Sequence, residues 1–172
     1  YHNVSYLCAV LKRLDEVEHL TENQDEIALA LWFHDAVYKS FSKSNESDSA
    51  DWARKFLDEN DMSEPVQERV HRLVMATSHS SVPKSDDEKL IVDIDLSILG
   101  SDKDQYAQFE AGVRREYRKV PSCIYARSRM AVLRGFLQRG RIYSSEPFYE
   151  ALERQARKNL QGELSRLQGG EV

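Results

Sequence analysis

A histidine and two aspartates stand where the sequence predicts a buried environment. His34 and Asp35 follow the apolar run 27–33 and precede Ala36 and Val37, so both side chains are expected near the core. A buried carboxylate costs several kcal/mol unless a cation, a metal or several hydrogen bonds compensate it, and segment 25–38 contains no Lys or Arg. A metal ion would meet that demand. A His-Asp hydrogen bond or a cap at the helix end is the alternative.

A second acidic position occurs in the apolar segment 90–100. On a helical wheel the apolar residues of this segment average to a direction about 25° from Asp95 and about 175° from Asp93. The pattern therefore predicts that Asp95 points inward, and that Asp93 points outward as a solvated acid or as a partner of a metal ligand. Two buried carboxylates in one small domain favour a shared cation over two separate explanations.

The elements that must position these residues are predicted to be helices throughout. Apolar residues recur three and four apart, which indicates an all-α chain, and Leu7, Val10, Leu14 and Val17 form the first stripe. The 172 residues predict a single domain, 1–172, a bundle of about eight helices with the motifs in 1–100 and further packing helices in 101–172. The later helices are expected at 25–38, 49–60, 63–79, 89–99, 102–119, 123–138 and 147–167. The second is expected to be buried on all sides, the fifth to close at a left-handed Gly100, and the last to stop at Gly169 and Gly170.

Composition and the absence of several sequence motifs argue against a number of function classes. The net charge is −5, from 24 Lys and Arg against 29 Asp and Glu, which argues against a nucleic-acid scaffold. No run approaches the roughly 20 apolar residues of a membrane span, and two cysteines fit a reducing compartment, so a cytoplasmic protein is expected. The start at Tyr1 predicts processing or residues that precede it. The glycine loops and metal or nucleophile motifs of P-loop enzymes, dinucleotide-binding folds, zinc proteases and serine hydrolases do not occur.

The order of the acidic and histidine residues resembles the HD superfamily of metal-dependent phosphohydrolases. In that superfamily a histidine on the first helix precedes a His-Asp doublet and a later aspartate on an apolar helix. The segments that carry the resemblance, and that look like the group named "predicted metal-dependent HD phosphohydrolase", are Tyr1-His2-Asn3, 30–38 with the doublet, Asn45-Glu46, 76–79, 93–100 and 156–160. The resemblance covers nearly the whole chain. It implies an HD-type helical fold with one divalent ion at its centre.

Carried over residue by residue, the resemblance implies a metal site and two proton-transfer candidates. His2, His34, Asp35 and Asp95 become the ligands, and this mixed nitrogen and oxygen set suits one Mn²⁺, Fe²⁺, Co²⁺, Ni²⁺ or Zn²⁺ ion. Water acidified by the ion would attack phosphorus. Glu46 and His79 are the candidate proton acceptor and donor. Alternatively, Glu46 is a first-turn acid of the third helix and His79 caps carbonyls of the fourth.

The substrate implied is a small phosphorylated molecule, with a nucleotide as the first expectation. Tyr38, Lys39 and Arg157 are the candidate substrate-binding residues; the alternatives are a ring at the core edge, a lysine at a helix end and an arginine paired with acids. Two other functions remain open: a di-iron oxygenase of HD type, and a non-catalytic binding module that keeps the metal for stability. One metal is favoured, and His79 is the residue that would indicate two. The oligomeric state stays open.

Overall fold

The computed structural model describes residues 4–39, 42–79 and 81–170. In these ranges the chain forms eight α-helices and two short 3-10 helices, and no strand. The predicted all-α fold class is therefore confirmed. None of the described helices is both long and apolar enough to cross a membrane.

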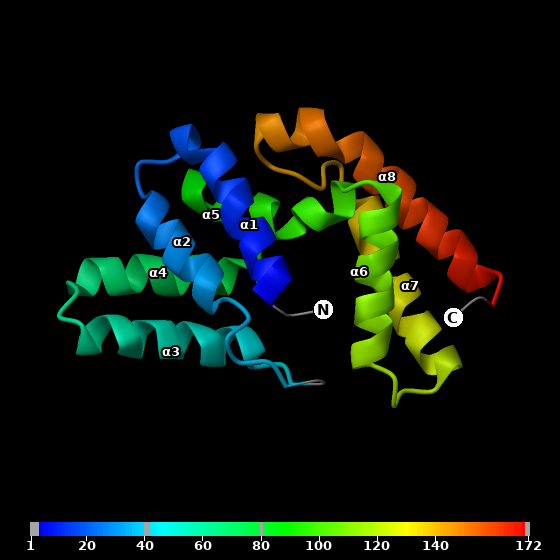
Figure 1. Ribbon diagram of the computed structural model, residues 1–172, viewed down its shortest axis with the longest axis horizontal. Coiled ribbons are helices and arrows are strands. Elements are labelled where there is room, and N and C mark those ends of the chain that lie inside the picture. The colour runs from blue at the N-terminus through cyan, green and yellow to red at the C-terminus, as the bar shows by residue number, and fades with distance from the viewer. Residues whose placement is uncertain (1–3, 40–41, 80, 171–172) are drawn as a thin grey trace. The chain divides into compact units, whose positions relative to one another are not determined.

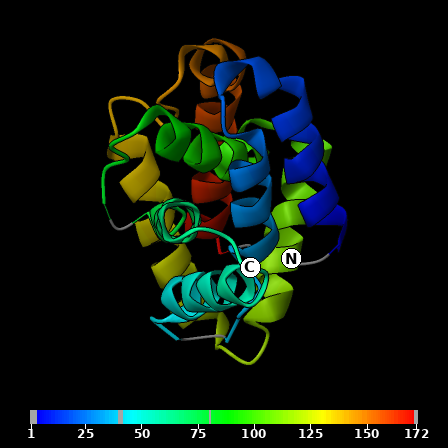
Figure 2. The ribbon, with the colours of Figure 1, turned by 90° about the vertical axis from the view of Figure 1, so that its left-hand side faces the viewer.

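Contacts between helices divide the chain into two compact units, which we call the N-terminal unit, within residues 2–95, and the C-terminal unit, within 96–172. The N-terminal unit consists of α1 (Val4–Glu16), η1 (Glu18–Leu20), α2 (Gln24–Phe33), α3 (Asn45–Glu59), α4 (Glu64–Ala76) and α5 (Asp86–Asp95). Helices α3 and α4 lie side by side, and α2 contacts both (Figure 1). Figure 2, which faces this unit, shows α1 beside α2. Helix α5 packs against α1, α2 and α4.

The core of the N-terminal unit explains why these segments fold as they do. Each helix turns an apolar stripe inward, and burying a Leu, Ile or Val side chain stabilises the fold by about 1.5–3 kcal/mol. Its fully buried aliphatic residues are Leu14, Ile27, Ala30, Leu31, Ala50, Ala53, Leu57, Val70, Val74, Ile91 and Ile94. Helix α4 begins after Ser63 and carries Pro65 in its first turn, as its sequence predicts.

Four features of this unit differ from the predictions. Asp93 was expected to face solvent, but it is fully buried. The cause is that α5 contacts three other helices and ends at Asp95, where the chain tightens into a 3-10 turn, so a single helical wheel over 90–100 misplaces the solvent-facing side. Helix α2 was expected to be buried on all sides, yet Trp32 is 59% exposed. Helix α2 ends at Phe33 rather than Tyr38, and α3 begins at Asn45 rather than Ser49.

The C-terminal unit consists of η2 (Leu96–Gly100), α6 (Lys103–Glu116), α7 (Ser122–Gln138) and α8 (Glu146–Gln168). Helix α8 packs on η2 and α7. Gly100 does not have the left-handed conformation that was predicted. It is required for close packing instead, because a Cβ atom at this position would lie 2.6 Å from the Cβ atom of Leu152 on α8. Gly170 has a φ of 85° just beyond α8, where the sequence predicted the stop.

A buried ion pair joins α6 and α7 in the C-terminal unit. Glu110 is 4% exposed, and Arg129 donates two hydrogen bonds to its carboxylate, of 3.1 and 2.6 Å. Tyr106 donates a third, of 2.6 Å. Burial and the adjacent Glu110 charge raise the pKa of Tyr106, so its hydroxyl stays protonated and continues to donate. The charge of Glu110 is therefore compensated inside the unit.

Candidate metal centre

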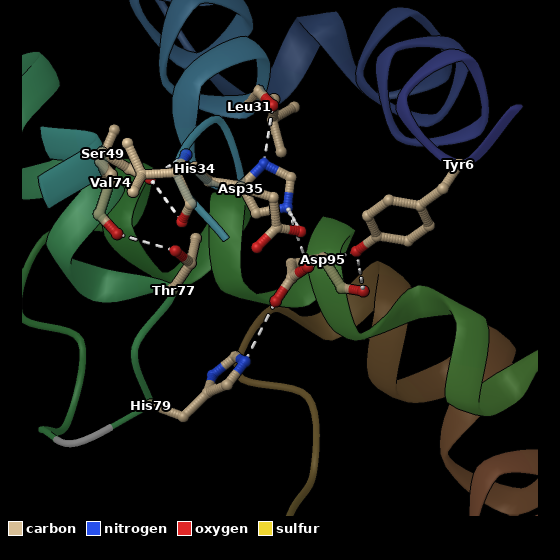
Figure 3. A network of polar contacts seen from close by, with 10 residues as sticks. Tyr6, Leu31, His34, Asp35, Ser49, Val74, Thr77, His79 and Asp95 are labelled. Atoms are coloured by element: carbon tan, nitrogen blue, oxygen red, sulfur yellow. Dashed lines mark hydrogen bonds and ion pairs between the residues drawn. The ribbon is translucent and has the colours of Figure 1, made fainter. Parts of the chain in front are cut away.

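The end of α2 sets the position of His34. This residue is the C-cap of the helix, its N–H donates to the Ala30 carbonyl at 2.9 Å, and its side chain is only 5% exposed. Its ring atom Nδ1 lies 2.7 Å from the carbonyl oxygen of Leu31 (Figure 3). Since a carbonyl only accepts, Nδ1 carries the proton in this contact. In the neutral ring, Nε2 then presents a lone pair to the cluster of carboxylates beyond it.

Two carboxylates face this Nε2 atom. Asp35 Oδ2 lies 3.0 Å away, because the helix ends at Phe33 and the turn brings adjacent side chains to the same side. Asp95 Oδ1, from the last residue of α5, lies 3.5 Å away. His34, Asp35 and Asp95, which are separated by up to 61 positions in the sequence numbering (95 − 34), thus meet in one place inside the N-terminal unit.

Two further side chains hold Asp95. The Tyr6 hydroxyl of α1 donates to Asp95 Oδ1 and lies 3.3 Å from its backbone oxygen. His79 Nε2 lies 3.0 Å from Asp95 Oδ2. His79 follows the C-cap of α4 in a left-handed conformation, with φ of 54°, and this turn directs its ring to the cluster. Left-handed non-glycine residues are uncommon and are frequently found at functional sites.

The electrostatics of the cluster follow from these contacts. Burial lowers the pKa of His34, but the Asp35 and Asp95 carboxylates more than offset this, so the pKa of His34 is raised well above its usual value. Burial opposes ionisation of Asp95, yet its contacts with His34 and His79 hold the pKa of this carboxyl well below its usual range. Asp95 therefore stays ionised beside a His34 ring that holds a proton more readily than an ordinary histidine.

The donor set fits a divalent ion in its chemistry. One imidazole and two carboxylates are ligands that first-row transition ions accept. With metal–ligand distances of about 2.1 Å, adjacent ligands lie about 3.0 Å apart at 90° and about 3.4 Å apart at 109°. The observed 3.0 and 3.5 Å from His34 Nε2 to Asp35 and Asp95 have these magnitudes.

The contacts of His34 Nε2 with the two carboxylates are not ordinary hydrogen bonds. This Nε2 atom is buried and makes no hydrogen bond of normal geometry with any described residue, although two carboxylate oxygens are within reach. Among the residues that the structure describes, no three His, Cys, Asp or Glu side chains converge on one point well enough to hold a metal as they lie. His2, the fourth expected ligand, lies outside the described residues.

The other expected site residues of the N-terminal unit surround the loop after α2. Lys39 is exposed, with its Nζ atom 3.9 Å from Asp48, and its backbone is clamped by the Asn45 side chain through hydrogen bonds of 3.0 and 3.1 Å. Tyr38 is half-buried in the same loop. Glu46 lies in the first turn of α3, and in the described chain no hydrogen bond or ion pair joins it to His34. The structure thus brings His79 to the cluster and gives Glu46 the position of a first-turn acid.

Arg157, expected at the substrate, belongs to the C-terminal unit and has other partners there. Its guanidinium donates to Glu153 at 2.8 Å and to the carbonyl oxygens of Leu137, Arg139 and Gly140 at 2.8 to 3.2 Å. Glu153 in turn accepts from the N–H groups of 142 and 143. These bonds fasten the loop between α7 and α8. The arginine is a structural clamp in this arrangement.

Comparisons with known proteins complete the description of the site. No family model, curated protein or solved structure matches this chain. The assignment of the site therefore depends on its own chemistry. Sequence reasoning missed Tyr6, although it stands four positions after His2 and such residues share one face of a helix. It also missed Asn45 as a clamp, because a side chain that closes a loop on the backbone leaves no periodic signal.

Proposed function

We propose that this protein is a metal-dependent phosphohydrolase of HD type that acts on small phosphorylated substrates, with nucleotides as the first candidates. The observation that carries the proposal is the buried Nε2 atom of His34, which lacks a normal hydrogen bond and faces the carboxylates of Asp35 and Asp95. A histidine whose other nitrogen is fixed by a carbonyl is the usual form of a metal ligand.

Each residue of the candidate site has its own role in the proposed reaction. His34, Asp35 and Asp95, joined by His2, would hold the ion, and the ion when bound supplies Lewis acidity and an acidified water. Tyr6 orients Asp95 through its hydroxyl. His79 lies against the other Asp95 oxygen, where an imidazole can hold a proton and pass it to a departing oxygen.

A second candidate function is favoured by the position of Asp95 between two imidazoles. Its Oδ1 atom faces His34 and its Oδ2 atom faces His79, an arrangement that also suits a carboxylate bridging two metals. Two metals would favour the di-iron oxygenase over the hydrolase. A stabilising site with no turnover is the third alternative, and it predicts metal binding without any reaction.

One set of measurements distinguishes the three functions. Metal content per chain is determined by elemental analysis, and phosphate release is measured on a panel of nucleotides and sugar phosphates with and without added Mn²⁺. The hydrolase predicts one metal and phosphate release, both lost in His34→Ala and kept in His19→Ala, whose side chain is exposed. Two iron atoms with oxygen consumption would support the oxygenase. Full metal content and activity in His34→Ala would contradict the site.

A further inference from the structure

Trp32 is the largest exposed side chain beside the candidate metal centre. Trp32 is 59% exposed, whereas its neighbours Leu31 and Phe33 are buried, with exposed fractions of 0% and 7%. A single exposed apolar residue is ordinary on a protein surface. Trp32 differs because it lines a pocket that also contains His34 and Asp35.

The lining of this pocket is part polar and part apolar. Its volume is about 200 Å³, and all of its lining residues belong to the N-terminal unit. The polar lining residues are Tyr6, His34 and Asp35, and the apolar ones are Leu7, Leu31, Trp32 and Ala36. Small-molecule sites usually enclose about 300–1,000 Å³. A space below that range accommodates a part of a small molecule and leaves the rest in water.

We propose that Trp32 forms a subsite for the nucleobase of a nucleoside monophosphate, whose phosphate lies beside the polar lining residues of the same pocket. This inference depends on the proposed phosphohydrolase function. The pocket lining combines both chemistries: the carboxylate of Asp35 and the imidazole of His34, and the indole of Trp32 with aliphatic neighbours. Every nucleobase has a flat π-face that can stack on such a ring, whichever polar groups the base carries at its edge.

The exposure of the indole favours a base over an acyl chain. A ring stacked on Trp32 keeps its polar edge and outer face in contact with water, which suits a polar heterocycle. An alkyl chain in the same position would leave much of its apolar surface exposed and gain less from binding. The subsite therefore predicts a preference for nucleoside monophosphates over sugar phosphates, which have no ring to stack.

The kinetic test compares two substrates. In Trp32→Ala, the ratio of kcat/KM for AMP to kcat/KM for ribose 5-phosphate should fall by about 5- to 150-fold, the range that base stacking on an aromatic side chain provides. Trp32→Phe should retain part of the ratio. Trp52→Ala is the matched control, because its ring is 51% exposed on α3 and packs on Phe33 outside this pocket.

A binding test makes the inference independent of turnover. The chain has two tryptophans, so Trp52→Phe leaves Trp32 as the only indole. Excitation at the red edge of its absorption, with Zn²⁺ present, reports ring stacking directly. AMP and UMP should quench this emission in a saturable way, and ribose 5-phosphate should not. The same titration of the unmodified protein and of Trp32→Phe gives the Trp32 contribution by difference, should the first variant fail to fold.

The outcomes separate the subsite from the proposed function. Phosphate release from AMP with no quenching and an unchanged substrate ratio would overturn the subsite and leave the hydrolase standing. Saturable quenching without phosphate release would support the subsite and contradict the hydrolase. Equal quenching by AMP and ribose 5-phosphate would also overturn the subsite, because the signal would not then come from the base.

Discussion

The replacement Asp95→Asn tests the candidate metal centre most directly. The amide has nearly the same shape as the carboxylate, so Tyr6 and His79 keep a neighbour of the same size. What changes is the negative charge, together with one of the two carboxylates that face His34. A metal would lose a charged ligand, whereas a purely structural hydrogen-bond network would lose much less.

The expected magnitude follows from mass action. A metal at 100 times its Kd stabilises the native state by about 2.7 kcal/mol. For a chain of this size that corresponds to a rise in Tm of about 5–11 °C. Loss of contacts around a bound metal lowers affinity by about 10- to 100-fold, and loss of a ligand itself by at least as much. After a 100-fold loss, the same metal concentration stabilises Asp95→Asn by only about 0.4 kcal/mol, or about 1 °C.

The assay is thermal unfolding of metal-stripped protein, followed by circular dichroism, with a titration of Mn²⁺ or Zn²⁺. Asp25→Asn is the matched control, since its side chain is exposed in the first turn of α2. It should show the full rise in Tm. An equal rise in Asp95→Asn and the unmodified protein would refute the reasoning, because Asp95 would then hold His34 and His79 without binding a metal.

Three further predictions concern packing, charge and pH. Gly100→Ala should lower the free energy of unfolding by about 1–3 kcal/mol in urea denaturation, because the added methyl group overlaps α8. Arg129→Met should lower it by about 3–5 kcal/mol, because Glu110 stays buried without its cation. The rise in Tm produced by metal should be small in acid and grow with pH. The reason is that the raised pKa of His34 keeps a proton on Nε2 that the metal must displace.

Each of these predictions has a result that would contradict it. Gly135→Ala is the control for the first, since its Cβ would meet nothing within 4 Å and alanine should stabilise the interior of α7 by about 0.5–1 kcal/mol. A loss in Gly135→Ala equal to that in Gly100→Ala would exclude overlap as the cause. Equal stability of Arg129→Met and the unmodified protein would mean that Glu110 takes up a proton at little cost. A metal effect that is constant from acid to neutral pH would exclude proton competition at His34.

The sequence predicts the helices well because their apolar spacing is a local property. Helices α7 and α8 begin and end within one residue of the predicted 123–138 and 147–167. The burial of each helix is a property of its neighbours, and there the sequence is weaker. A stripe average for α5 cannot include the second and third partner helices that enclose Asp93. The same limit explains Trp32, whose exposure depends on which side of α2 receives no neighbour.

The candidate site was predictable only where its signal is local in the sequence. The cost of placing Asp35 and Asp95 beside the core is visible in sequence, since each stands in an apolar segment; in the structure Asp95 is 13% exposed and Asp35 is 29% exposed. The contact of Tyr6 with Asp95 depends on the crossing of α1 and α5, which no local pattern contains. The carbonyl partners of Arg157 were equally invisible, since a cation free to meet phosphate and one bonded to loop carbonyls look alike in sequence.

The left-handed backbone of His79 implies a trade-off between stability and the proposed activity. A β-carbon in that conformation costs about 1–2 kcal/mol, which glycine would not incur. Glycine at position 79 would relieve this strain but would also remove the imidazole that faces Asp95. Directed evolution of a more thermostable variant should therefore keep His79 and introduce stabilising substitutions at other positions.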